Sequence, residues 1–224
     1  MLDGFYRCCR LDGRRLAILL CVLVWLGIQQ AALAASPATI LVMGDSLSAG
    51  YGVKVDSGWV ALLGKRLATQ GYDYRIVNGS VSGETSAGGK VRLPALLKSH
   101  QPAIVILELG GNDGLRGLPN AQLRSNLSTM IDAAHQSGAK VLLAGMQIPP
   151  NYGQAYTAGF KAVFDDLART KGVTLVPFFL DGVALDASLL QADNLHPNEA
   201  GQPRMLDNVW PRLRALLKPT KQVK

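Results

Sequence analysis

A serine that directly follows a short apolar run is the most informative feature of the sequence. Residues 39–44, TILVMG, are apolar, β-branched or small, and Asp45-Ser46 and further small residues follow them. Such a run is typical of a strand that delivers Ser46 onto a tight turn at the carboxyl end of a sheet, where ligands and catalytic groups collect in open α/β folds. Taken alone, the pattern is equally consistent with an Asp45-Ser46 pair that only caps or turns the chain.

A histidine near the C-terminus could supply the base that a serine nucleophile needs. A serine hydroxyl is a weak nucleophile by itself, and its base needs a third group to fix the tautomer and stabilise the imidazolium. Asp193 precedes His196 by three residues, so a turn could fold the carboxylate back onto Nδ1 and leave Nε2 for Ser46. A lone histidine is more often a surface or capping residue. However, His100 and His135 lie in polar helix-end contexts, which leaves His196 as the candidate base.

Two further strand ends carry groups that could donate hydrogen bonds to an oxyanion. Residues 103–109, AIVILEL, predict a buried strand, and Asn112 follows in a Gly-Gly-Asn turn, so its amide would lie at the same sheet edge as Ser46. Residues 74–77 predict another strand, and the turn after it contains Gly83, whose N–H is not shielded by a Cβ. Each segment alone is an ordinary strand-to-helix turn. Together they predict the groups that acyl transfer requires.

At this point the sequence resembles the SGNH (GDSL-type) hydrolases. Four ordered blocks carry the resemblance: GDSLS at 44–48, Gly83 in SVSGET, GGND at 110–113 and DNLH at 193–196. It is strongest to the secreted bacterial branch of multifunctional esterases, thioesterases and lysophospholipases. It covers the chain after residue 34, including LPALLK, GGNDGLRG and PPNYG at 93–98, 110–117 and 149–153.

The resemblance implies a role for each of these positions. Ser46 would be the nucleophile and His196 the base, which Asp193 orients. The oxyanion hole would consist of the Ser46 and Gly83 backbone N–H groups and the Asn112 side chain. No metal or other cofactor would be needed. The implied fold is the flavodoxin-like one of the SGNH hydrolases.

The resemblance also implies a serine hydrolase that cleaves carboxylic esters and thioesters, among them acyl esters, lysophospholipids and acyl thioesters, through an acyl-enzyme. Two loops, 114–120 and 146–156, would line the acyl site. The second offers four candidate substrate-binding residues: Met146, Ile148, Tyr152 and Tyr156. A carbohydrate or aryl acetylesterase, or a serine peptidase, could use the same triad and stays open as an alternative.

Two other classes of protein are alternatives to a serine hydrolase. A metallophosphoesterase could use Asp45, Asn112, Asp113 and His196 as ligands, although such sites usually contain several histidines. A non-catalytic module could bind a small polar ligand at the sheet edge. That reading leaves unexplained why a nucleophile, a base, an orienting acid and two donors all occur.

The elements that must position these groups alternate along the chain. Helical patterns fall at 59–70, 88–99, 121–137, 154–171 and 202–218. Strand patterns fall near 39–44, 74–77, 103–109, 140–144 and 173–177. Five strands with helical crossovers predict an α/β fold, a three-layer α/β/α sandwich with a mostly parallel five-stranded sheet. Neither a repeat nor a second domain is indicated, so residues 35–224 are expected to form one domain.

The first 34 residues have the pattern of a signal peptide. A basic segment precedes a thirteen-residue apolar run at 16–28, and Ala32-Leu33-Ala34 offers a cleavage site. We therefore expect a periplasmic or secreted protein, with an uncleaved anchor as the lesser alternative. All three cysteines lie in this segment, at positions 8, 9 and 21, so the mature chain would have no disulfide.

The charge of the chain argues against a nucleic-acid partner. The formal net charge is +7, from 23 basic and 16 acidic residues, and the basic residues are scattered except near the C-terminus. No basic patch with interleaved aromatic residues occurs. We expect a monomer with a small acyl ester or thioester as its partner. The basic tail leaves weak peripheral contact with membrane lipid open.

Overall fold

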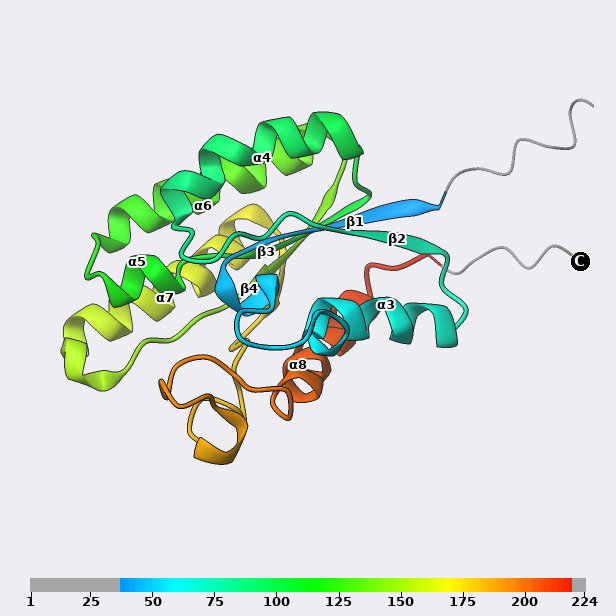
Figure 1. The fold of residues 1–224 in the computed structure, drawn as a ribbon. Helices are drawn as coiled ribbons and strands as arrows, with labels where there is room; N and C mark the ends of the chain where they lie inside the picture. The colour runs from blue at the N-terminus through cyan, green and yellow to red at the C-terminus, as the bar shows by residue number, and fades with distance from the viewer. Residues whose placement is uncertain (1–36, 219–224) are drawn as a thin grey trace, which may run out of the picture. The chain divides into compact units, whose positions relative to one another are not determined.

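The computed structural model describes residues 37–218, which are built on a five-stranded sheet (Figure 1). Every neighbouring pair of strands is parallel, and the strand order is β2-β1-β3-β4-β5. The strands are β1 (Ala38–Gly44), β2 (Tyr74–Asn78), β3 (Ile104–Glu108), β4 (Lys140–Ala144) and β5 (Thr174–Val176). The predicted signal peptide, residues 1–34, lies outside the described residues.

Five long helices of the described residues cover the two faces of the sheet (Figure 1). One face carries α4 (Ser86–His100), α6 (Asn120–Gln136) and α7 (Gln154–Lys171), and the other carries α3 (Trp59–Thr69) and α8 (Gln202–Arg214). Two short helices, α2 (Ser46–Ala49) and α5 (Gly111–Leu115), follow β1 and β3. Three 3₁₀ turns are η1 (Val55–Ser57), η2 (Pro150–Tyr152) and η3 (Ala187–Leu189). The predicted three-layer α/β/α sandwich with its parallel sheet is confirmed.

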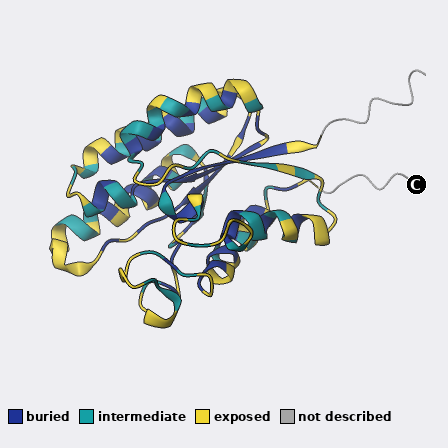
Figure 2. Ribbon diagram, viewed as in Figure 1, coloured by how far each residue is buried: buried dark blue, intermediate teal, exposed yellow. Residues whose placement is uncertain are grey.

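The central strands are buried on both faces because helices cover both sides of the sheet (Figure 2). Residues 40–43 of β1 and all of β3 are buried. A strand in this position needs a continuous apolar run, which the TILVMG and AIVILEL segments provide. The single charged residue in these runs, Glu108, is also buried.

Element boundaries differ from the predicted ones where tertiary contacts decide them. Helix α4 begins at Ser86, two residues before the predicted start, because buried Asp113 accepts hydrogen bonds from the Ser86 N–H and hydroxyl. Helix α8 ends at Arg214 rather than at residue 218, and Leu216 N–H then bonds to the Leu213 carbonyl in a turn. The loop predicted at 114–120 begins inside α5.

The strand register brings the candidate site segments to one edge of the sheet. Gly44, the last residue of β1, pairs with Glu108, the last residue of β3. Beyond β2, the N–H groups of Gly79 and Val81 bond to the carbonyls of Val42 and Gly44. The turns that contain Ser46, Gly83 and Asn112 therefore all leave the carboxyl edge.

Within residues 37–218, none of the helices combines the length and the apolar character that crossing a membrane requires.

Candidate active site

Ser46 is presented by a tight turn between β1 and the four-residue helix α2. The Asp45 carboxylate caps this helix by accepting the Leu47 N–H at 3.0 Å. Gly50 then ends the helix in the left-handed conformation, with φ of 78°, which glycine adopts without steric cost. The turn leaves the Ser46 side chain half-buried, at the boundary between the core and solvent.

The Ser46 hydroxyl lies at one end of a short chain of hydrogen bonds. Ser46 Oγ is 2.9 Å from His196 Nε2, and His196 Nδ1 is 2.6 Å from Asp193 Oδ2. The Asp193 carboxylate folds back because its Oδ1 also accepts the N–H groups of Leu195 and His196, each at 3.0 Å. Asn194 makes this turn possible with a left-handed φ of 54°.

The charge state of Asp193 sets the direction of these bonds. Hydrogen bonds from the His196 N–H, the His196 ring and the Leu195 N–H lower the pKa of Asp193 to about 2. The carboxylate is therefore ionised at neutral pH and accepts a hydrogen bond from the N–H group of His196 Nδ1. This fixes the imidazole tautomer and leaves Nε2 free to accept the Ser46 hydroxyl proton.

The Asn112 amide is held in one orientation at the same edge. Its Nδ2 donates to Asp45 Oδ2 at 3.1 Å and to the Glu84 carbonyl at 3.0 Å. Reversing the amide would place its oxygen against both of these acceptors. The amide hydrogens therefore face Asp45 and the turn after β2.

Gly83 lies in the turn that follows β2, at the edge where β1 also ends. Its φ of 78° lies in the left-handed region, where a side chain would be strained. Arg116 Nη2 donates to the Gly83 carbonyl at 3.1 Å, which ties this turn to the end of α5.

Two buried carboxyl groups lie at the serine turn, Asp45 within it and Glu108 at the end of β3. Glu108 is fully buried, and its Oε2 accepts Ser48 Oγ–H at 2.6 Å and Asp45 N–H at 3.3 Å, while Oε1 has no hydrogen-bond partner. Burial, followed by repulsion from Asp45, raises the pKa of Glu108 well above its ordinary value. Burial likewise raises the pKa of Asp45, although the bonds from Leu47 and Asn112 oppose the shift. We take Glu108 as neutral and Asp45 as the ionised member of the pair.

A small cavity of about 100 Å³ opens beside Ser46 and His196. Its lining is mostly apolar and includes Leu47, Leu115, Met146, Ile148, Pro149 and Leu180. Of the four candidate substrate-binding residues, Met146 and Ile148 line the cavity, whereas Tyr152 and Tyr156 do not. These tyrosine hydroxyls instead donate to the Leu115 and Leu118 carbonyls, at 2.9 and 2.7 Å, and hold the loop after α5.

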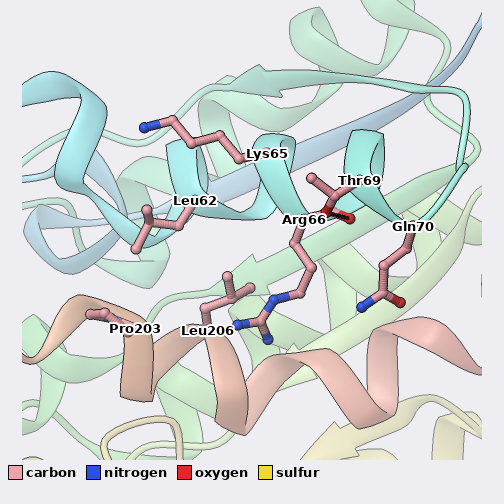
Figure 3. Close-up of a pocket in the computed structure, with 7 residues that line it drawn as sticks. All are labelled: Leu62, Lys65, Arg66, Thr69, Gln70, Pro203 and Leu206. Carbon is pink, nitrogen blue, oxygen red and sulfur yellow. Dashed lines mark hydrogen bonds between the residues drawn. The ribbon is translucent and has the colours of Figure 1, made fainter.

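A larger hollow of about 350 Å³ lies between α3 and α8 and contains none of the predicted site residues (Figure 3). The Arg66 guanidinium crosses from α3 toward α8, where it bonds to Asp207 at 2.7 Å and lies over the Trp210 ring. Arg66 thus joins the two helices, whereas Lys65 donates to the Asp56 carbonyl and Thr69 donates to the Arg66 carbonyl.

The residues of the metal-site alternative do not form a ligand cluster. Asp113 is turned into the core, where it binds Ser86, and Asn126 donates to the same serine hydroxyl. No group of three or more histidine, cysteine or acidic side chains suited to a metal ion occurs within residues 37–218.

Three polar residues at the site were not found from the sequence. Glu108 carries a detectable signal, since a charged residue inside an apolar strand run must be buried with a partner or neutral. Gln191 and Gln202 flank the His196 turn and carry no such signal, because glutamine is common in solvent-exposed loops.

The fold and the site together define a class of protein. A parallel α/β/α sandwich that carries a Ser-His-Asp hydrogen-bond chain at its carboxyl edge has the architecture of a serine hydrolase. The model of the GDSL-like lipase/acylhydrolase family matches residues 42–204, and the chain belongs to this family. The resemblance noted from the four sequence blocks is thereby confirmed.

Relatives of known name agree with this assignment. The chain is 56% identical over 183 residues to esterase TesA of Pseudomonas aeruginosa, covering 82% of this chain and 91% of that protein. It is 41% identical over 184 residues to thioesterase 1/protease 1/lysophospholipase L1 of Escherichia coli strain K12, covering 82% and 87%. A crystal structure of TesA superimposes with a TM-score of 0.79 at 57% identity, covering 80% of this chain and 99% of that one.

Proposed function

We propose that the protein hydrolyses carboxylic esters and thioesters through an acyl-enzyme on Ser46. The observation that carries the proposal is the hydrogen-bond chain from Ser46 Oγ to His196 Nε2, at 2.9 Å, and from His196 Nδ1 to Asp193, at 2.6 Å. The names of the two relatives, esterase TesA and thioesterase 1/protease 1/lysophospholipase L1, support the same reaction class, and the name protease 1 leaves the serine peptidase alternative open.

In the first half of the reaction, Ser46 Oγ attacks the substrate carbonyl while His196 Nε2 takes the hydroxyl proton. Asp193 stabilises the imidazolium that forms. The alcohol or thiol then leaves with the proton from Nε2. In the second half, water attacks the acyl-enzyme by the same route, and Ser46 is regenerated.

The oxyanion of each tetrahedral intermediate needs donors in place before it forms. We assign this role to the Ser46 N–H, the Gly83 N–H and Asn112 Nδ2. Asp45 and the Glu84 carbonyl orient the Asn112 amide, so an incoming oxyanion would share a hydrogen of Nδ2 with one of these acceptors.

The apolar cavity beside Ser46 supports an acyl chain as the group that is bound. Met146 and Ile148 are the candidate acyl contacts. The volume of the cavity, about 100 Å³, leaves the acetylesterase alternative open. Rates with p-nitrophenyl esters of increasing chain length separate the two: a strong preference for acetyl over every longer group supports the acetylesterase.

The test of the reaction is Ser46→Ala in the purified protein. We expect loss of ester hydrolysis and of labelling by a fluorophosphonate probe, with an unchanged circular dichroism spectrum. Ser99→Ala, at an exposed serine of α4, is the matched control and should retain both activities. Turnover retained by the Ser46 variant would refute the proposal.

We further propose that residues 1–34 are a cleaved signal peptide and that 35–224 act as a single periplasmic or secreted monomer. The basic, apolar and small-residue segments of the N-terminus support export.

A further inference from the structure

The turn that carries His196 is fastened to the segment that follows the serine. We define the histidine segment as residues 189–202 and the post-serine segment as residues 51–59. Gln191 Nε2 donates to the Tyr51 carbonyl at 2.8 Å, and Gln202 Oε1 accepts the Trp59 N–H at 3.0 Å. Both bonds run from a glutamine side chain to the backbone of the other segment, so they fix where that backbone lies.

The same two amides meet again at one carbonyl next to the histidine. Gln191 Nε2 donates to the Pro197 carbonyl at 3.0 Å, and Gln202 Nε2 donates to it at 3.3 Å. In addition, Gln191 N–H bonds to the His196 carbonyl at 2.7 Å. Both glutamines thus form hydrogen bonds to the backbone on the C-terminal side of His196, and each also forms a hydrogen bond to the post-serine segment.

The post-serine segment is shaped to accept Gln191. A Cβ on Gly52 would lie 2.1 Å from Gln191 Oε1, and the φ of Gly52, 72°, is one that side chains rarely adopt. Gln202 is buried at the start of α8. The Gln191 side chain therefore fills the space that Gly52 leaves, and the Gln202 side chain is enclosed by its neighbours.

We propose that Gln191 and Gln202 are positioning residues that set the distance between His196 Nε2 and Ser46 Oγ. The two reacting side chains are 150 positions apart in sequence and sit on separate turns, so contacts between these turns help to hold them in register. Neither glutamine lines the cavity beside Ser46. The inference rests on the proposed function, because it concerns the geometry of the proposed base.

The decisive variant is Gln191→Met, which keeps the length of the side chain, removes both donors and adds no charge. Since small misplacements of reacting groups are costly, we expect kcat to fall about 10- to 100-fold. KM should change less than about twofold, because Gln191 does not contact the acyl cavity, and the rate of fluorophosphonate labelling should fall in parallel with kcat. We expect the same pattern for Gln202→Met: a fall in kcat and in the labelling rate, with little change in KM.

A double-mutant cycle distinguishes positioning from a general structural role. If Gln191 acts through the imidazole, Gln191→Met should have no further effect in a His196→Ala background. A structural role would lower the residual rate of that background by the same factor as in the wild type. Gln122→Met, at an exposed position in the first turn of α6, is the control and should leave kcat unchanged.

Two results would overturn the inference while leaving the proposed function intact. One is an active wild-type enzyme whose Gln191→Met variant retains kcat within about twofold. The other is an equal loss with and without His196. By contrast, a wild-type protein without esterase activity would refute the proposed function itself.

Discussion

Glu108 is the residue whose surroundings are most unusual for its chemistry. It ends a strand in the middle of the sheet, is fully buried and lacks a basic partner among its hydrogen bonds. Its one engaged oxygen holds the hydroxyl of Ser48 and the N–H of Asp45, the residues on either side of the Ser46-Leu47 pair. A neutral acid can make these bonds without the cost of burying an uncompensated charge. We infer that Glu108 stabilises the serine turn in its protonated form.

The raised pKa of Glu108 predicts how stability depends on pH. The folded state retains a proton that the unfolded chain has released, so the free energy of unfolding falls as pH rises from the ordinary glutamate pKa toward the raised one. Below the ordinary value both states are protonated and the effect vanishes. Glu108→Gln keeps an acceptor and cannot ionise. The melting temperature of Glu108→Gln minus that of the wild type should therefore become more positive as the pH rises from 4 to 9.

The control for this prediction is Glu199→Gln, because Glu199 is exposed and its bond to Lys54 N–H is long, at 3.4 Å. The melting temperature of the Glu199→Gln variant should stay close to that of the wild type between pH 4 and pH 9. A Glu108→Gln variant that becomes relatively less stable as pH rises would contradict a neutral Glu108.

Asn112→Ala tests the proposed oxyanion donor. Loss of one preorganised donor typically lowers kcat by about 10²- to 10³-fold, because the donor acts mainly on the transition state. We expect such a fall in kcat, with a smaller change in KM, in steady-state hydrolysis of a p-nitrophenyl ester. Asn151→Ala, at an exposed residue of η2, should be neutral. Equal rates for the two variants would remove Asn112 from the proposed mechanism.

At the residue scale, side-chain chemistry limited what the sequence could predict. Ser46, His196 and Asp193 are predicted from the sequence because few other residues could fill their roles, and the structure places them in contact. Tyr152 and Tyr156 are predicted to bind substrate from their position in a loop. Their hydroxyls donate to the Leu115 and Leu118 carbonyls, and their contact with substrate stays a prediction. A phenol ring is equally suited to either environment, so its direction depends on packing that the sequence does not display.

At the element scale, the approach of α4 to the sheet depends on a single glycine. A Cβ on Gly89 would lie 2.3 Å from Leu109 Cδ1 and 3.3 Å from Met43 Cε, both of which are buried. A Cβ on Gly64 of α3 would meet only Ile76 Cδ1, at an ordinary 3.7 Å. The same residue type therefore serves close packing in one helix and is dispensable in the other.

We expect Gly89→Ala to destabilise the protein by about 1–3 kcal/mol, the usual cost of overpacking a core. Gly64→Ala should be neutral or stabilising by up to about 1 kcal/mol, because alanine has the higher helix propensity. Chemical denaturation of both variants measures the two free energies. If Gly64→Ala proves the more destabilising of the pair, the packing argument is wrong.

Most helices and strands were predicted from apolar periodicity, and their ends were predicted less well. The strand at 140–144 and the helix at 154–171 match the structure residue for residue. In contrast, α4 starts early because Asp113, from a different turn, binds Ser86. A boundary set by a partner 27 positions away cannot be found from local spacing.

At the scale of the whole molecule, the alternation of strands and helices predicted the layers but not the order of the strands. The order β2-β1-β3-β4-β5 places β1 and β3 side by side, and this adjacency brings the Ser46 and Asn112 turns together. The periodicity of apolar residues does not indicate which strands pair. The strand ends predicted that these turns share the carboxyl edge of the sheet, and the resemblance to a known family implied that they form one site.

The proposed signal peptide predicts the N-terminus of the exported protein. Cleavage after the small residue Ala34 should yield a mature chain that begins at Ala35. Intact-mass measurement of protein recovered from the periplasm or medium tests this. Replacing Ala32 and Ala34 with bulky residues should block processing. A recovered protein that retains the apolar run 16–28 would favour the uncleaved anchor.

The contact between Trp59 and Ser48 has a practical consequence. Trp59 is fully buried, and its indole N–H donates to Ser48 Oγ at 3.3 Å, the hydroxyl that Glu108 also holds. Within residues 37–218 the other tryptophan, Trp210, sits on α8 beneath Arg66. Indole fluorescence responds to hydrogen bonding at its nitrogen. In a Trp210→Phe variant of residues 35–224, which lack Trp25, the emission of Trp59 becomes an intrinsic optical reporter of rearrangements beneath the reactive hydroxyl, with no dye attached.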